Sequence, residues 1–197
     1  MTRDYLPLTA HPLQAGARFH LPGQGRERVR TDSPALAVMT DLREIPAATI
    51  DLLAPLDAAN RFMIRRGVRL LLVTDDDRQV LGLITANDIL GEKPVQFGLE
   101  RGIKRQDILV RDIMTPRERL EVLLYSDLAR AEVGHIVATL KHSGRQHALV
   151  VDFVGDDGVQ ALRGIFSASQ IARQLGEAIQ TTEVAQTFAE IGAALAR

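Results

Sequence analysis

The segment Ala37-Val38-Met39-Thr40 recurs 75 residues further along the chain as Asp112-Ile113-Met114-Thr115, and this internal repeat decides the fold. Behind each Met-Thr pair, apolar residues at helical spacing lead up to a glycine, which is Gly67 in the first copy and Gly144 in the second. Apolar positions three and four apart predict one face of a helix, and glycine commonly stands just past a helix end. The chain therefore contains two copies of one structural unit.

Two short apolar runs with a turn between them follow each predicted helix. The runs are 68–73 and 80–84 in the first copy, and 148–154 and 161–166 in the second. Asp75-Asp76-Asp77-Arg78 separates the first pair of runs, and Gly155-Asp156-Asp157-Gly158 separates the second. Runs of this length, bounded by Asp and Gly, predict buried strands joined as hairpins. Each second strand leads directly into another predicted helix.

The repeated unit is therefore an extended piece, a helix, two strands and a helix, which predicts an α/β (α+β) fold. We divide the chain into an N-terminal arm or linker at 1–35, repeat one at 36–92, an inserted connector at 93–107, repeat two at 108–178 and an amphipathic C-terminal helix at 179–197. A unit of about 60 residues buries only about 60% of its unfolded surface and is marginal alone. We therefore expect the two copies to share an interface and to behave as one cooperative body.

The composition removes several classes of functional site. No cysteine is present, so disulfides, thiolate nucleophiles and cysteine-ligated metals are excluded. The five histidines lack a paired metal-binding spacing, and no Walker, Gly-x-Ser-x-Gly or His-Glu-x-x-His motif occurs. We expect neither catalysis nor a metal site.

Basic side chains gather between positions 101 and 119, where a nucleic-acid groove is the alternative to a solvated face. They are Arg101, Lys104, Arg105, Arg111, Arg117 and Arg119. Acidic residues alternate with them, the stretch holds no aromatic side chain to stack on bases, and the whole chain has a net charge of −1. We interpret this cluster as a solvated face and expect no nucleic-acid partner.

Neither a secretory signal nor a membrane span is recognisable. The N-terminus places Arg3 and Asp4 before prolines instead of a basic patch before an apolar stretch. No run approaches the ~18 consecutive apolar residues of a membrane helix. We expect a cytoplasmic protein without membrane contact.

The Met-Thr opening, the helix that ends in Gly67-Val68-Arg69, the strand-turn-strand and Gly82-Leu-Ile-Thr-Ala-Asn-Asp-Ile89 resemble a tandem pair of CBS domains (cystathionine-beta-synthase type). The resemblance implies a pseudo-twofold, stand-alone regulatory module of the bacterial type that forms a homodimer and signals in trans to a protein partner not identified by the sequence. It also implies an adenosine-containing ligand between the copies, namely AMP, ADP, ATP or S-adenosylmethionine, and no required cofactor.

The resemblance also implies which residues contact that ligand. In the family the Thr-x-x-Asp that opens the last helix grips the ribose, basic residues just before the first strand contact phosphate, and apolar strand residues flank the base. Here these residues are Thr85 and Asp88 at the ribose, Arg69, His147 and Arg145 at the phosphate, and Leu83 and Ile84 at the base.

Helix capping is the alternative explanation of Thr85 and Asp88, because residues of these types satisfy the free N–H groups of a first turn. Ser167-x-x-Gln170 in the second copy also fits a capping box, but glutamine lacks the carboxylate that the ribose grip requires. We therefore expect one ligand at the Asp88 site and a weaker second site built on Gly164, Ile165 and Ser167.

Two functions from different classes remain open. The first is a sensor, in which an adenosine-containing ligand shifts the arrangement of the copies and so alters a partner. The second is a structural adaptor whose clefts are vestigial and whose surface binds another protein.

Overall fold

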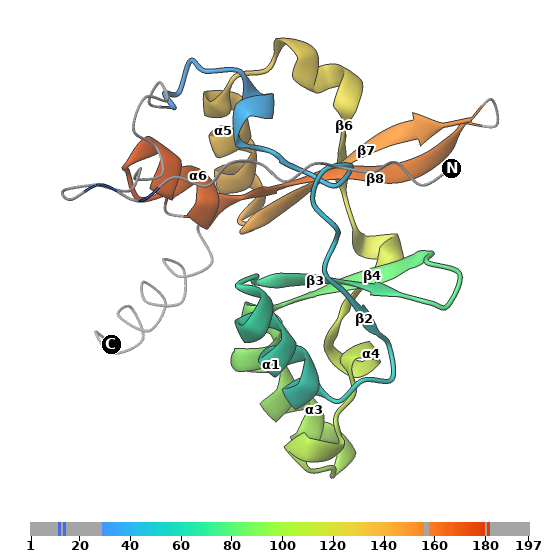
Figure 1. Ribbon diagram of the computed structural model, residues 1–197. Helices are drawn as coiled ribbons and strands as arrows, with labels where there is room; N and C mark the ends of the chain where they lie inside the picture. The colour runs from blue at the N-terminus through green and yellow to red at the C-terminus, as the bar shows by residue number, and fades with distance from the viewer. Residues whose placement is uncertain (1–11, 13, 15–28, 156–157, 180, 182–197) are drawn as a thin grey trace, which may run out of the picture.

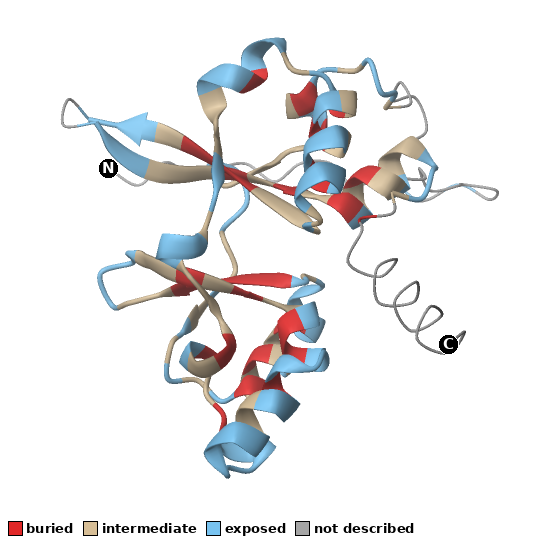
Figure 2. Ribbon diagram, turned by 180° about the vertical axis from the view of Figure 1, so that it is seen from behind, coloured by how far each residue is buried: buried red, intermediate tan, exposed pale blue. Residues whose placement is uncertain are grey.

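The computed structural model describes residues 12, 14, 29–155, 158–179 and 181, and they form two four-stranded sheets that face each other (Figure 1). Helices cover the outer side of each sheet, so the molecule has four layers. Each sheet buries a core against its own helices, and a third core of Leu70, Leu72 and Leu149 lies between the sheets. In Figure 2 the buried residues follow these layers. Most of the predicted N-terminal arm and C-terminal helix lies outside the described residues.

The predicted order of elements is confirmed in both copies. The first copy contains β1 (Thr40–Asp41), β2 (Thr49–Asp51), α1 (Leu56–Arg66), β3 (Leu70–Thr74), β4 (Val80–Thr85) and α2 (Ala86–Leu90). The second contains α4 (Val110–Ile113), β5 (Thr115–Pro116), β6 (Val122–Leu124), α5 (Val133–Ser143), β7 (His147–Val154), β8 (Val159–Ser167) and α6 (Ala168–Leu175). Short 3-10 helices η1 (Ala35–Val38), η3 (Arg117–Arg119) and η4 (Tyr125–Arg130) join them.

Helix α1 shows why these residues fold as they do. Leu56, Ala59 and Met63 recur at helical spacing and are buried against the sheet. The helix ends where Gly67 adopts a left-handed conformation with φ of 64°, which glycine enters without the steric penalty of a Cβ. Gly144 ends α5 in the same way with φ of 67°.

The inserted connector at 93–107 is ordered rather than a plain linker. It forms α3 (Lys93–Arg101) and the 3-10 helix η2 (Arg105–Asp107). Phe97 of α3 packs against the core beneath the first sheet. Val95 and Leu99 of the same helix are exposed, so only some of the apolar residues of this segment pack into the core. Within the described part of the chain, no helix is long and apolar enough to cross a membrane.

The two sequence copies exchange their opening strands. The sheet of the first copy has the order β2-β3-β4-β5, and its last strand comes from the start of the second copy. The sheet of the second copy has the order β1-β8-β7-β6, and its first strand comes from the start of the first copy. Neither copy can therefore complete its own sheet. We call each sheet together with its helices a half of the molecule, the first half being built on β2-β3-β4-β5 and the second on β1-β8-β7-β6.

Each exchanged strand lies over a glycine of the other copy. Gly82 pairs with Pro116, and Gly164 pairs with Asp41 at the equivalent position. A Cβ on Gly82 would collide with the carbonyl oxygen of Thr115 and would lie 3.3 Å from the Sδ of Met114, whereas one on Gly164 would lie 2.8 Å from the Cγ of Met39. The repeated Met-Thr pair of each copy therefore packs against a glycine of the other copy, Gly164 for the first pair and Gly82 for the second.

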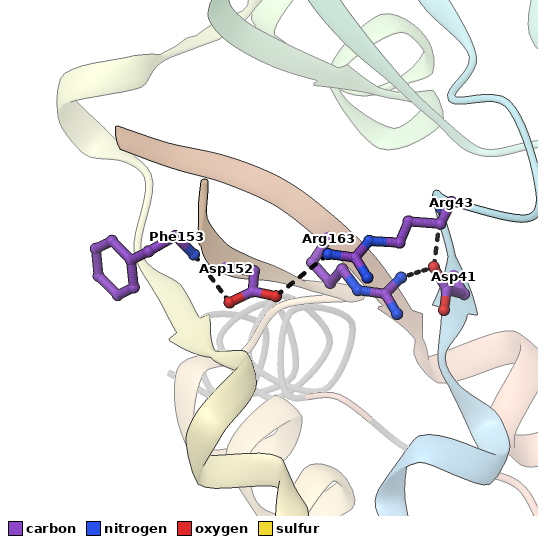
Figure 3. A network of polar contacts seen from close by, with 5 residues as sticks. All are labelled: Asp41, Arg43, Asp152, Phe153 and Arg163. Atoms are coloured by element: carbon purple, nitrogen blue, oxygen red, sulfur yellow. Dashed lines mark hydrogen bonds and ion pairs between the residues drawn. The ribbon is translucent and has the colours of Figure 1, made fainter. Parts of the chain in front are cut away.

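A polar network secures β1 on the second sheet (Figure 3). The guanidinium of Arg163 donates to the carboxylate of Asp41. The same guanidinium stacks 4.9 Å from the ring centroid of Tyr125. Arg43 donates its backbone N–H to the same carboxylate at 2.8 Å, and its side chain lies 3.7 Å from Asp152. Because the Arg163 side chain is only 11% exposed, water screens this ion pair less than one on the surface. Pro116 takes the place of Asp41 in the first sheet, so this carboxylate anchor belongs to one half only.

We predict that Gly82→Ala lowers the free energy of unfolding by about 1–3 kcal/mol, because the new methyl group forces a backbone carbonyl to move. Gly164→Ala should lower it less, since it meets the flexible side chain of Met39. Urea unfolding of the two variants measures the difference. An equal or larger loss in Gly164→Ala would contradict this packing.

Candidate functional site

A cavity of about 310 Å³ opens between the two halves, and we call it the first cleft. The first half supplies the start of β3, the end of β4 and the start of α2, while the second supplies the start of β7. Its polar lining residues are Arg69, Thr85, Asn87, Asp88, Lys93, Thr115, Arg119, Glu121, Arg145, Gln146 and His147. Its apolar lining residues are Leu70, Leu83, Leu120 and Leu149. A cavity of this volume with a few convergent polar groups has the size of a small-ligand site.

Thr85 and Asp88 form a complete capping box at the start of α2. One carboxylate oxygen of Asp88 accepts from the backbone N–H of Thr85 at 2.9 Å and from its hydroxyl at 2.6 Å, and the N–H of Asp88 donates back to that hydroxyl at 3.2 Å. Asp88 is only 9% exposed. The capping interpretation is therefore confirmed, and it leaves the second carboxylate oxygen for other donors.

Lys93 occupies that second oxygen. Its ammonium donates to Oδ1 of Asp88 from the first turn of α3. The Lys93 side chain is 55% exposed, so it can rotate into solvent without disturbing the core. The charge of Asp88 is balanced in this state, and a donor that replaces Lys93 would meet an acceptor already held in place by the capping box.

Positive charge dominates the rest of the first cleft. Arg145 pairs with Glu121 at 3.1 Å, whereas Arg69 donates only to the neutral amide oxygen of Asn87, at 3.1 Å. Arg119 makes no ion pair with any residue that the structure describes. Four cationic side chains therefore face the two carboxylates of Asp88 and Glu121, and the surplus favours an anion.

The pKa of His147 in the first cleft is displaced from its usual value. Burial lowers the pKa of His147 from 6.5 to about 4, and the positive charge of Arg69 adds to this effect. His147 is therefore neutral at physiological pH and can offer one N–H donor and one acceptor.

Six of the seven residues predicted for the main site line the first cleft; they are Arg69, Leu83, Thr85, Asp88, Arg145 and His147. Ile84 does not line it, because alternate residues of a strand point to opposite faces. Its side chain is fully buried in the core beneath the first sheet.

The predicted equivalence of Arg69 and His147 is wrong by one position. The N–H that starts α2 donates to the carbonyl of Arg69, and the N–H that starts α6 donates to that of Gln146. Gln146 is therefore the counterpart of Arg69, and His147 is the counterpart of Leu70. The position that is apolar in the first copy is therefore a histidine in the second.

Sequence reasoning missed Lys93, Asn87 and Arg119. Arg119 belongs to the basic cluster that we interpreted as a solvated face, but it lines the first cleft because the exchanged strand β5 carries η3 to its rim. Other members of the cluster behave as expected, since Arg111 and Arg117 pair with neighbouring carboxylates.

A second cavity of about 580 Å³ lies at the equivalent position of the other half, and we call it the second cleft. Ile165, Ser167 and Gln170 line it, but Gly164 does not, because the side chain of Met39 covers it. The capping box predicted here is absent: the Ser167 side chain makes no cap and lies 3.1 Å from the hydroxyl of Ser169. Gln170 instead accepts from the hydroxyl of Thr40 at 3.2 Å. Arg69, Leu70 and His147 line both clefts.

The comparisons with known proteins agree with this architecture. Residues 37–94 match the family model of the CBS domain. An uncharacterized conserved protein from Pyrococcus horikoshii is 22% identical with a TM-score of 0.53, and the match covers 78% of this chain and 99% of that one. The CBS-pair protein CBSX2 from Arabidopsis thaliana, solved in complex with AMP, is also 22% identical, with a TM-score of 0.51 and coverage of 72% and 94%. No curated protein sequence matches the chain.

We predict that His147 makes the protein less stable as the pH falls from about 6.5 to about 4. In this window the unfolded chain binds a proton at His147 while the folded protein does not, so the free energy of unfolding decreases with falling pH. Over this pH range the free energy of unfolding of His147→Gln should decrease by about 1–3 kcal/mol less than that of the wild type. His142→Gln, at an exposed position near the end of α5, is the control. Identical pH profiles for wild type and His147→Gln would refute the assignment.

Proposed function

We propose that this chain is a non-enzymatic regulatory module that binds an anionic adenosine nucleotide in the first cleft. The premise is that residues 37–94 match the CBS-domain family model and that the chain has the fold of a CBS-domain pair. The observation that carries the proposal is the convergence of Asp88, held by its capping box, with Arg69 of the same half and Arg145 of the other. A nucleotide has the matching groups: a vicinal diol that donates hydrogen bonds and a phosphate that accepts them.

The ribose would take the place of Lys93 at Asp88. An ionised carboxylate accepts hydrogen bonds only, and each charge-assisted bond contributes about 1.5–3 kcal/mol. Oδ2 of Asp88 is used by the capping box, so the diol would bind Oδ1 and displace the Lys93 ammonium. Once displaced, Lys93 remains at the rim of the cleft, where it can contact the phosphate.

The charge of the cleft favours AMP, ADP or ATP over S-adenosylmethionine. Arg69 and Arg119 have no carboxylate partner among the described residues, and a phosphate would supply the missing negative charge. The sulfonium of S-adenosylmethionine would instead add a positive charge beside them. The Arabidopsis protein of similar fold supports this choice, since it was solved with AMP.

Regulation would follow from the position of the ligand between the halves. A nucleotide that contacts both halves binds best when they are correctly arranged, so its binding shifts the population toward that arrangement. We propose that the module acts as a homodimer in the cytoplasm and passes this shift to a protein partner in trans.

The proposal is tested by thermal unfolding of the purified protein with AMP, ADP, ATP, S-adenosylmethionine and adenosine. We expect stabilisation by the nucleotides, which reaches roughly 4 kcal/mol at about 1,000 times the dissociation constant if only the folded state binds. Asp88→Ala should abolish it, whereas Gln170→Ala should not.

Asp112→Ala is the matched control, because Asp112 makes the equivalent bond at the start of α4 by accepting from the N–H of Leu109 at 2.9 Å. Both aspartate variants lose a cap worth about 1 kcal/mol, but only Asp88→Ala should lose the ligand. No stabilisation of the wild type by any of these compounds would contradict the sensor and favour the structural adaptor.

A further inference from the structure

The function proposed above leaves the larger second cleft without a ligand, although its charge is more one-sided than that of the first. Its described lining residues include four arginines and no aspartate or glutamate; the arginines are Arg65, Arg66, Arg69 and Arg173. None of the four makes an ion pair with a described residue. Arg65 lies 5.9 Å from the centroid of the Phe62 ring, and Arg69 donates to an amide.

These arginines converge from both halves of the molecule. Arg65 and Arg66 stand in the last turn of α1, Arg69 precedes β3, and Arg173 stands in the last turn of α6. The helix dipole favours a cation at the end of each helix. It does not explain why two helix ends from different halves direct cations into one cavity that lacks carboxylates. Such a cluster repels itself, so a bound anion would relieve it.

The neutral polar groups of the second cleft also suit an oxyanion. Thr40, Ser167 and Ser169 supply hydroxyl groups, and the start of α6 has no side-chain cap. In the first cleft the equivalent helix start is closed by the carboxylate of Asp88. Gln170 in that position removes the repulsion that a carboxylate would exert on a phosphate, and it also removes the acceptor that a ribose diol requires.

We propose that the second cleft is a binding site for a multiply charged phosphate oxyanion such as inorganic pyrophosphate, held by Arg66, Arg69 and Arg173 without a nucleoside. Arginine suits this ligand because its planar fork can donate two parallel hydrogen bonds to one phosphate. The site does not depend on a nucleotide in the first cleft, so the two proposals can fail separately.

The test is isothermal titration of the full chain with sodium pyrophosphate. We expect Arg66→Gln and Arg173→Gln each to weaken binding about tenfold or more, since each removes a charge-assisted contact. Arg61→Gln makes the same charge change at an exposed position of α1 that lines neither cleft, and it should retain wild-type affinity. All three positions are exposed, and equal thermal midpoints without ligand would show that the variants fold.

Further titrations locate the anion. Arg119 lines only the first cleft, so a loss of pyrophosphate binding in Arg119→Gln that Arg173→Gln does not share would place the anion there and overturn the proposal. Adenosine, which has no phosphate, should bind wild type and Arg173→Gln equally. If pyrophosphate fails to bind at millimolar concentration while ATP binds and loses affinity in Arg173→Gln, the arginines serve the tail of a nucleotide and the proposal is wrong. Absence of both pyrophosphate and ATP binding would also refute it.

Discussion

The structure depends on one packing constraint: the Met-Thr segment that opens each copy must lie against a glycine of the other copy. Met114 lies against Gly82 and Met39 covers Gly164, and at Gly82 the exchanged strand approaches so closely that a Cβ would collide with the carbonyl oxygen of Thr115. Neither sheet reaches four strands without this exchange. The same exchange builds the clefts, because β5 brings Thr115 to the first and β1 brings Thr40 to the second.

Chemical differences at a few positions make the two clefts unequal despite their shared geometry. Asp88 and its counterpart Gln170 determine whether a helix start presents a carboxylate, and the two proposed ligands depend on this difference. Arg69 and His147 line both cavities, so an anion in either cleft acts on the same cation. Linkage requires that any effect of one ligand on the affinity of the other be reciprocal.

The sequence predicted the elements well where the chain carries a strong local signal. The glycines that end α1 and α5, the Asp- and Gly-rich turns and the apolar runs were each visible in short windows. The exchange was not, because β1 and β5 have two residues each and carry no periodicity. Six of the seven residues predicted for the main site line the first cleft, and the resemblance supplied their positions. The prediction for Ile84 was wrong because alternate residues of a strand point to opposite faces of the sheet. Lys93 was missed because its contact with Asp88 depends on the fold of the connector, for which no helix was predicted.

The central claim is that a nucleotide binds between the halves with its ribose on Asp88, and a crystal structure of the protein grown with AMP tests it most directly. The account predicts AMP in the first cleft, with both ribose hydroxyls within hydrogen-bond distance of the Asp88 carboxylate, Lys93 moved away from Oδ1 and the phosphate among Arg69, Arg119 and Arg145. AMP bound only in the second cleft, or a first cleft in which Lys93 still occupies Asp88 at saturating AMP, would contradict it.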